Sequence, residues 1–122
     1  MGMGEQSERI GRLEERVRRD PAGRGLISSE ATRGVLCEGH LAAAAADLAS
    51  KSGPVAILTG FFIPHGEPAA AETDGPPGAA TLARVLVGLG REVVLLTDLP
   101  CEGAMRATAA AAGLEEVELA VA

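Results

Sequence analysis

The stretch Val55-Ala-Ile-Leu-Thr59, followed directly by Gly60, decides how this sequence folds. A short, continuous apolar run is typical of a strand that is buried on both faces, as the strands of parallel sheets are. Glu92-Val-Val-Leu-Leu-Thr97 is a second run of this kind. Residues 117–121 alternate apolar and polar side chains and predict a third strand. We therefore expect three strands in one sheet.

Helices are predicted between these strands. The first ends at Gly90, and an Ala-rich second one runs from Pro100 to Gly113. Four apolar residues at helical spacing are expected to form the buried face of the first helix: Leu82, Val85, Leu86 and Leu89. The order strand, helix, strand, helix, strand predicts an α/β fold that is three-layered and Rossmann-like, with a mostly parallel sheet.

Upstream of the sheet the chain is expected to be helical. A charged helix begins at Ser7 and stops at Asp20-Pro21, and a second helical region is strongest from Leu41 to Ala49, where five consecutive alanines favour helix. We therefore divide the chain into two parts. Residues 1–53 form an N-terminal helical arm and a helix that packs on the sheet, and residues 54–122 form the N-terminal half of an α/β domain.

A sheet of only three parallel strands has two bare edges, whereas parallel sheets normally have more strands and helices on both faces. The fold is therefore expected to be incomplete in this chain. Either a homo-oligomer or a missing C-terminal half would complete it. The strand at residues 117–121 is the edge expected to pair with another chain.

Composition and charge exclude several classes of function. Residues 54–122 hold nine acidic residues against three arginines, and the chain has no Trp or Tyr. Such a surface repels phosphate backbones and lacks rings for base stacking, so no nucleic-acid partner is expected. No apolar run is long enough to span a membrane, and neither a signal peptide nor a transit peptide is recognised. The two cysteines, Cys37 and Cys101, match no zinc-binding pattern. We expect a cytoplasmic protein.

Common catalytic and nucleotide-binding motifs do not fit. After the first strand the sequence reads Gly60-Phe-Phe-Ile-Pro-His-Gly66, which is not the dinucleotide-binding Gly-x-Gly-x-x-Gly. The only lysine is Lys51, before the strand, so there is no Walker loop. No Gly-x-Ser-x-Gly nucleophile elbow is present either.

The long loop predicted from Gly60 to Pro77 is where we expect the chemistry. Loops of this length in a compact domain are usually functional or disordered. Its segment Glu72-Thr-Asp-Gly-Pro-Pro-Gly78 carries two carboxylates, Glu72 and Asp74, whose side chains point the same way in an extended chain. Two neighbouring carboxylates can hold different protonation states, as acid–base catalysis requires. We therefore predict that both are catalytic.

A simpler interpretation is that Asp74 only caps the following helix. A capping carboxylate accepts hydrogen bonds from the N–H groups two and three positions on. Here those positions are Pro76 and Pro77, which have no N–H. The prolines therefore favour a functional role for Asp74.

Ligands of open α/β sheets bind beyond the carboxyl ends of the strands, so the loops after Thr59 and Thr97 are expected at one rim. This position makes a further set of residues candidates for substrate binding: Thr59, Gly60, Thr73, Gly75, Gly78 and Asp98. A divalent cation held by Glu72, Asp74 and Asp98 is an alternative, because hard cations take oxygen ligands. No cofactor is required by the sequence.

Three segments of the sequence resemble the D-glutamate cyclase family. They are Val55-Ala-Ile-Leu-Thr-Gly-Phe61, Glu72-Thr-Asp-Gly-Pro-Pro-Gly-Ala79 with the helix at Leu82-Ala-Arg-Val-Leu86, and Leu95-Leu-Thr-Asp98. The resemblance implies an α/β lyase that closes D-glutamate to 5-oxo-D-proline with loss of water, so that a small amino acid is the substrate. It also implies that this chain is the N-terminal portion only, because a later Gly-Asp-Gly-Gly-Asn-Glu-like motif of the family is missing. Activity of the chain alone is therefore not expected.

The other interpretations are weaker. The chain is alternatively a non-catalytic module that binds a small ligand or lends strands to a partner. Cys101 at a helix start is a candidate reactive thiol, which the acidic Glu102 beside it opposes. His65 in the loop is a candidate substrate contact, although a plain surface histidine is favoured, and His40 is expected to be structural.

Overall fold

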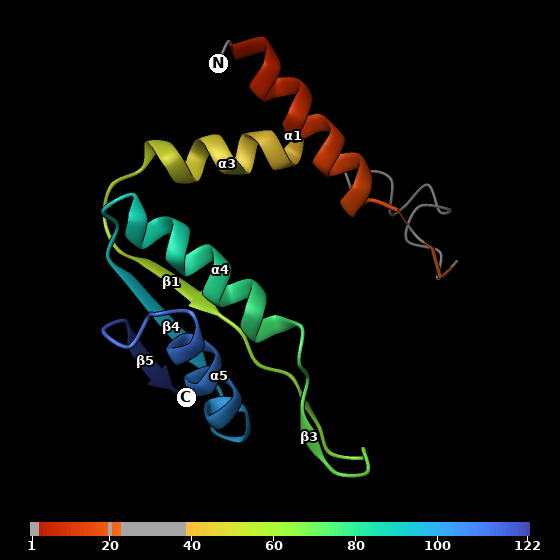
Figure 1. Ribbon diagram of the computed structural model, residues 1–122, viewed down its shortest axis with the longest axis vertical. Helices are drawn as coiled ribbons and strands as arrows, with labels where there is room; N and C mark the ends of the chain where they lie inside the picture. The colour runs from red at the N-terminus through yellow and green to blue at the C-terminus, as the bar shows by residue number, and fades with distance from the viewer. Residues whose placement is uncertain (1–2, 20, 23–38) are drawn as a thin grey trace. The chain divides into compact units, whose positions relative to one another are not determined.

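The computed structural model describes residues 3–19, 21–22 and 39–122 (Figure 1). They fall into two compact units, Met1–Lys51 and Ser52–Ala122, and each is described by itself. No helix among the described residues is long and apolar enough to cross a membrane. Residues 23–38, upstream of the second helix, lie outside the described residues.

The first unit contains helix α1 (Met3–Val17) and helix α3 (His40–Ser50), which pack against each other. The start predicted for α1 at Ser7 is one turn too late. Glu14 of α1 joins the two helices, because its Oε2 accepts the N–H of Gly39 at 2.8 Å and its Oε1 accepts the N–H of Leu41 at 3.0 Å.

Glu14 supplies a cap that α3 cannot make for itself. The N-cap residue of α3 is Gly39, whose φ of 86° suits glycine and whose missing side chain leaves the first N–H groups of the helix without a local acceptor. The Glu14 side chain is buried, and its hydrogen bonds from the N–H groups of Leu41 and Gly39 lower the pKa of its carboxyl from the ordinary value of 4.5. An ionised Glu14 therefore holds α1 and α3 together.

The second unit is built on a parallel sheet in the order β1–β4–β5, formed by Val55–Leu58, Val93–Thr97 and Glu118–Val121. Ile57 lies opposite Leu95, which in turn lies opposite Leu119. Helix α4 (Gly75–Gly88) connects β1 to β4. The short 3₁₀ helix η1 (Leu99–Cys101) and helix α5 (Glu102–Ala111) connect β4 to β5. The predicted α/β fold with a parallel sheet is confirmed.

Helices α4 and α5 pack against each other and lie on the same face of the sheet (Figure 1). The alternation along the strands agrees with this arrangement, because Ile57, Val93, Leu95 and Thr97 are buried whereas Leu58 on the opposite face is 78% exposed. The expectation that β1 is buried on both faces is therefore wrong within this unit. As an edge strand with helices over one face, β1 buries only Ile57.

Of the four residues predicted for the buried face of α4, only Leu86 is buried. Val85 is 55% exposed and Leu89 is 67% exposed, and Leu82 is exposed as well. The residues of α4 that are buried are mostly small: Pro76, Ala79, Ala80, Ala83 and Leu86. Alanines allow the helix to lie close to the sheet and to α5, where Met105 and Leu95 fill the core between them.

The segment predicted as a loop from Gly60 to Pro77 contains a two-stranded antiparallel ribbon. Its strands are β2 (Phe62–Ile63) and β3 (Ala70–Ala71), and the peptide bond between Glu67 and Pro68 is cis. The N–H of Glu72 donates to the carbonyl of Phe61 at 2.8 Å and continues the pairing toward the sheet. The ribbon projects from the carboxyl end of β1 (Figure 1). It therefore brings Glu72 back to the point where the chain left the sheet.

Candidate functional site

A cavity of about 240 Å³ opens at the carboxyl end of β1, between the base of the ribbon and the first turn of α4. Five of the residues predicted for the site line this cavity: Thr59, Gly60, Glu72, Asp74 and Gly75. Leu58, Phe61 and Pro76, which the sequence analysis did not single out as site residues, complete the lining. The rim of the parallel sheet thus gathers most of the residues chosen from the sequence.

The backbone of this rim is held in place by the sheet. The N–H of Thr59 donates to the carbonyl of Leu96 at 2.9 Å, which extends the pairing of β1 with β4 by one residue. A backbone hydrogen bond also joins Glu72 to Phe61 across the ribbon. Both sides of the cavity are therefore attached to regular structure, as a site that orients a ligand requires.

Asp74 is the N-cap residue of α4, yet its side chain makes no capping hydrogen bond. The physical reason is the one expected from the sequence: Pro76 and Pro77 have no N–H to offer a carboxylate. Only the backbone closes the turn, with the N–H of Gly78 donating to the carbonyl of Asp74 at 3.4 Å. The Asp74 side chain is exposed at the cavity, as a carboxylate that meets a ligand must be.

Two glycines in the lining leave room for hydroxyl and carboxylate groups. A Cβ atom on Gly75 would come within 2.6 Å of the Thr59 Oγ1, so any side chain there would displace the threonine. Gly60 has a φ of 154°, and a Cβ on it would lie 3.0 Å from the Asp98 Oδ1 and 3.1 Å from the Thr97 Oγ1. Gly60 therefore lies between the cavity and the Thr97 and Asp98 side chains at the end of β4.

Asp98 lies behind Gly60 and does not line the cavity itself. Its Oδ1 accepts the N–H of Cys101 at 3.2 Å and caps η1. The Cys101 side chain is 1% exposed, and its hydrogen bond with Asp98, together with burial, raises the pKa of the thiol. The alternative of a reactive Cys101 thiol is therefore wrong, because a thiol that is buried and protonated is a poor nucleophile.

Thr97 is a residue that the sequence analysis did not single out for the site. Its side chain is 1% exposed, and its Oγ1 has no hydrogen-bond partner within the part of the chain that the structure describes. Buried hydroxyls are nearly always hydrogen-bonded, so an unpartnered one is unusual. The signal in the sequence was its position: Thr97 is a polar residue at the carboxyl end of the central, otherwise apolar strand.

The remaining candidates are not gathered at the cavity. Thr73 and Gly78 are exposed near it but are not part of its lining. His65 is exposed in the turn of the ribbon, and His40 is the exposed first residue of α3. Among the described residues, no three His, Cys, Asp or Glu side chains are placed to hold a metal ion. The alternative of a cation held jointly by Glu72, Asp74 and Asp98 is therefore not supported.

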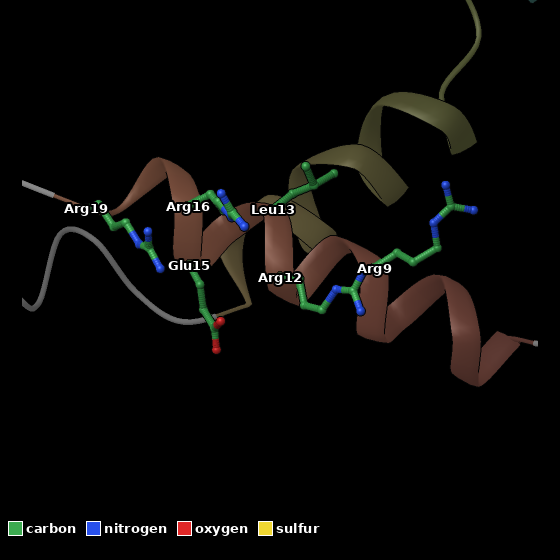
Figure 2. Close-up of a pocket in the computed structure, with 6 residues that line it drawn as sticks. All are labelled: Arg9, Arg12, Leu13, Glu15, Arg16 and Arg19. Carbon is green, nitrogen blue, oxygen red and sulfur yellow. The ribbon is translucent and has the colours of Figure 1, made fainter.

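A second hollow, of about 530 Å³, lies in the first unit along α1. Four arginines, together with Leu13 and Glu15, line it: Arg9, Arg12, Arg16 and Arg19. Their guanidinium groups are spread along the helix and do not meet at one point (Figure 2). A small anion would need them to converge, so the cavity at the end of β1 is the better candidate for a ligand site.

Comparison with known proteins shows the family of the chain. Residues 13–122 match the model of a protein family described as D-glutamate cyclase-like, C-terminal. The human protein D-glutamate cyclase, mitochondrial, is 36% identical over 92 residues, which is 75% of this chain and 14% of the human protein. The chain thus spans only a small part of the length of that relative. No solved structure matches.

These matches correct one expectation from the sequence. The resemblance suggested the N-terminal portion of a cyclase, whereas the matching family model describes a C-terminal domain. The motifs around Thr59, Asp74 and Asp98 indicated the family but not the position of this segment within longer members. The chain belongs to the D-glutamate cyclase-like, C-terminal family.

Proposed function

We propose that the cavity at the end of β1 belongs to the active site of a lyase that closes D-glutamate to 5-oxo-D-proline with loss of water. The observation that carries this proposal is that Glu72, Asp74 and Thr59 line one cavity, in a chain similar to human D-glutamate cyclase. Because this chain spans 14% of that protein, the proposal concerns the full-length protein that carries the sequence.

The reaction joins two ends of one molecule. The amine attacks the carbon of the side-chain carboxyl group, so that a C–N bond forms, a C–O bond breaks and one water leaves. The ammonium group gives up two protons in the process, and the departing oxygen takes up two. Holding the substrate folded so that nitrogen and carbon are in contact removes much of the entropic barrier, which is what a cavity with rigid walls supplies.

Glu72 and Asp74 are the two groups suited to move these protons. One carboxylate removes a proton from the ammonium group to expose the lone pair, and a protonated carboxyl delivers a proton to the leaving oxygen. Both side chains are exposed at the cavity and within reach of a bound ligand. The Thr59 hydroxyl lies next to Gly75 in the lining of the cavity and would fix the orientation of a carboxylate.

The experiment is to incubate the purified full-length protein with D-glutamate and to measure 5-oxoproline by NMR. We expect conversion of D-glutamate, and we expect Glu72→Gln and Asp74→Asn each to lower the rate by about 100-fold or more, the usual contribution of a general acid or base. Glu67→Gln is the matched control, because Glu67 is an exposed carboxylate on the same ribbon but outside the cavity lining.

A folded wild-type protein that binds an amino acid but forms no product would contradict the proposal. The alternative of a non-catalytic module that binds a small ligand would then take its place. Equal rates in the wild type and in the Asp74→Asn variant would also contradict it, since the carboxylate would then have no part in the reaction.

A further inference from the structure

The cavity at the end of β1 has an apolar part beside its two carboxylates. Leu58, Phe61 and Pro76 line it together with Glu72 and Asp74. We propose that Phe61 is the specificity-determining residue of the site, because its ring packs on the methylene groups of the substrate next to Glu72. This inference rests on the proposed function and names the residue that recognises the apolar part of the amino acid.

Phe61 and Glu72 lie directly opposite each other at the base of the ribbon. The register pairs Phe62 with Ala71, and its continuation by one residue brings Phe61 to Glu72. The backbone hydrogen bond from Glu72 to Phe61, 2.8 Å long, agrees with this pairing. Opposite side chains of an antiparallel pair stand on the same face, with Cβ atoms about 5 Å apart. An aromatic ring therefore stands beside a carboxylate that the proposed reaction uses.

The exposure of Phe61 indicates that a ligand covers it. Phe61 and Phe62 are the two aromatic residues of the chain, and Phe61 is 65% exposed at the cavity. Its backbone is fixed, because hydrogen bonds join it to Glu72 and to the buried side chain of Cys101. Ligand cavities are typically lined by apolar side chains with a few polar groups among them, and covering an exposed ring favours binding.

The arrangement of apolar and acidic groups matches a folded D-glutamate. When the substrate is folded for ring closure, the amine and the reacting carboxyl group lie together on one edge, and two methylene groups form the opposite edge. Glu72 and Asp74 serve the first edge, where protons move, and Phe61 serves the second. Contact with the ring therefore helps to hold the substrate in the folded form that reacts.

Kinetics of variants at position 61 test this contact in the full-length protein. Taking two methylene groups out of water favours binding by roughly ten-fold, so Phe61→Ala is expected to lower kcat/KM for D-glutamate by about that factor. Phe61→Leu, which keeps an apolar side chain, is expected to restore most of it. Leu99→Ala is the matched control, because Leu99 is 70% exposed but outside the cavity lining. Wild-type kcat/KM in Phe61→Ala would overturn the inference.

A substrate with a polar group on a methylene carbon tests the specificity. In 4-hydroxy-D-glutamate a hydroxyl group replaces a hydrogen on Cγ, and against the Phe61 ring it finds no hydrogen-bond partner. The wild type is expected to prefer D-glutamate over this derivative by roughly ten-fold in kcat/KM. Phe61→Ser is expected to reduce the preference. Equal kcat/KM for the two substrates in the wild type would contradict the role given to the ring.

Calorimetry with 5-oxo-D-proline tests the contact without turnover, because the product keeps both methylene groups. Burial of apolar surface on binding gives a negative heat-capacity change. We expect a negative change for the wild type and a smaller one for Phe61→Ala. A merely structural role for Phe61 would lower the melting temperature and leave the heat-capacity change of the folded protein unaltered, and that result would overturn the inference.

The two proposals fail in different ways. Turnover of D-glutamate at the same kcat/KM in the wild type and in Phe61→Ala would overturn the role of Phe61 and leave the lyase in place. Binding of 5-oxo-D-proline with a heat-capacity change that depends on Phe61, but without turnover of D-glutamate, would overturn the lyase and leave the apolar contact. Absence of both binding and turnover would overturn both.

Discussion

The hydroxyl oxygen of Thr59 occupies the space next to the Cα of Gly75, where a Cβ atom would come within 2.6 Å of it. Thr59 follows β1 and Gly75 begins α4, so this single contact joins the end of the sheet to the start of the helix at the cavity. A side chain at position 75 would therefore have to displace the Thr59 hydroxyl.

Gly75→Ala is therefore expected to destabilise the protein by about 1–3 kcal/mol, the usual cost of overpacking, and to reduce activity by displacing Thr59. Gly78→Ala is the matched control in the same helix, because a Cβ there meets nothing within 4 Å. It is expected to keep or raise stability, since alanine favours helix over glycine. Urea unfolding of both variants measures the difference. Equal stability of the two would contradict the account of the Thr59 contact.

The capping contact between α1 and α3 predicts a pH dependence. Because the Glu14 pKa is lowered in the folded protein, its contribution to stability is fully present above its unfolded value of 4.5 and is lost as the pH falls through the folded value. Helix content measured by circular dichroism is expected to fall in acid more steeply in the wild type than in Glu14→Gln, because the variant lacks the titrating group. At neutral pH the helix content of Glu14→Gln is expected to be lower than that of the wild type.

Glu8→Gln is the control for this measurement, because Glu8 is an exposed carboxylate of the same helix. It is expected to follow the wild-type pH profile. If Glu14→Gln also followed that profile over the whole pH range, the Glu14 cap would contribute nothing to the stability of α1 and α3.

The environment of Cys101 predicts slow chemical modification. In a Cys37→Ser background, where Cys101 is the remaining thiol, iodoacetamide at neutral pH is expected to label the folded protein far more slowly than the urea-unfolded protein. Asp98→Asn is expected to lower the thiol pKa toward its ordinary value, because the hydrogen bond with Asp98 is the largest cause of the rise. Equal labelling of folded and unfolded protein would contradict the burial of this side chain.

The edges of the sheet predict self-association. Strands β1 and β5 lie at the two edges of the sheet, and Val121 of β5 is partly exposed. We expect the sedimentation coefficient to rise with concentration, and we expect Val121→Lys to weaken this rise, because a charge on an edge strand opposes pairing. A monomer at all concentrations, for the wild type as for the variant, would show that neither edge is used.

The fold followed from the sequence where the pattern was strong. The apolar runs at Val55 and Val93 and the helices between them gave the parallel α/β order, because chain connection rules leave few alternatives. The buried face of α4 was predicted correctly only at Leu86. Leu82, Val85 and Leu89 have the same helical spacing as Ala79, Ala83 and Leu86, and periodicity alone cannot tell which face lies close to a sheet and a neighbouring helix.

The site was predictable only in part. The rim position of Thr59 and the missing N–H groups after Asp74 are properties of local sequence, and both agree with the structure. The ribbon that returns Glu72 to the cavity was not foreseen, because its strands are two residues long and lie among prolines and glycines. The Thr97 hydroxyl has no hydrogen-bond partner among the described residues, and this depends on tertiary packing, which the sequence alone does not show.

The catalytic role of Asp74 is tested most directly with the Asp74→Asn variant of the full-length protein, by measuring D-glutamate conversion and melting temperature on the same sample. We expect a nearly unchanged melting temperature, because the Asp74 side chain makes no capping hydrogen bond, and a loss of activity by about 100-fold or more. A lost cap would instead cost about 1 kcal/mol and several degrees. A melting temperature lowered by that amount, with conversion of D-glutamate retained, would show that Asp74 caps α4 and takes no part in the reaction.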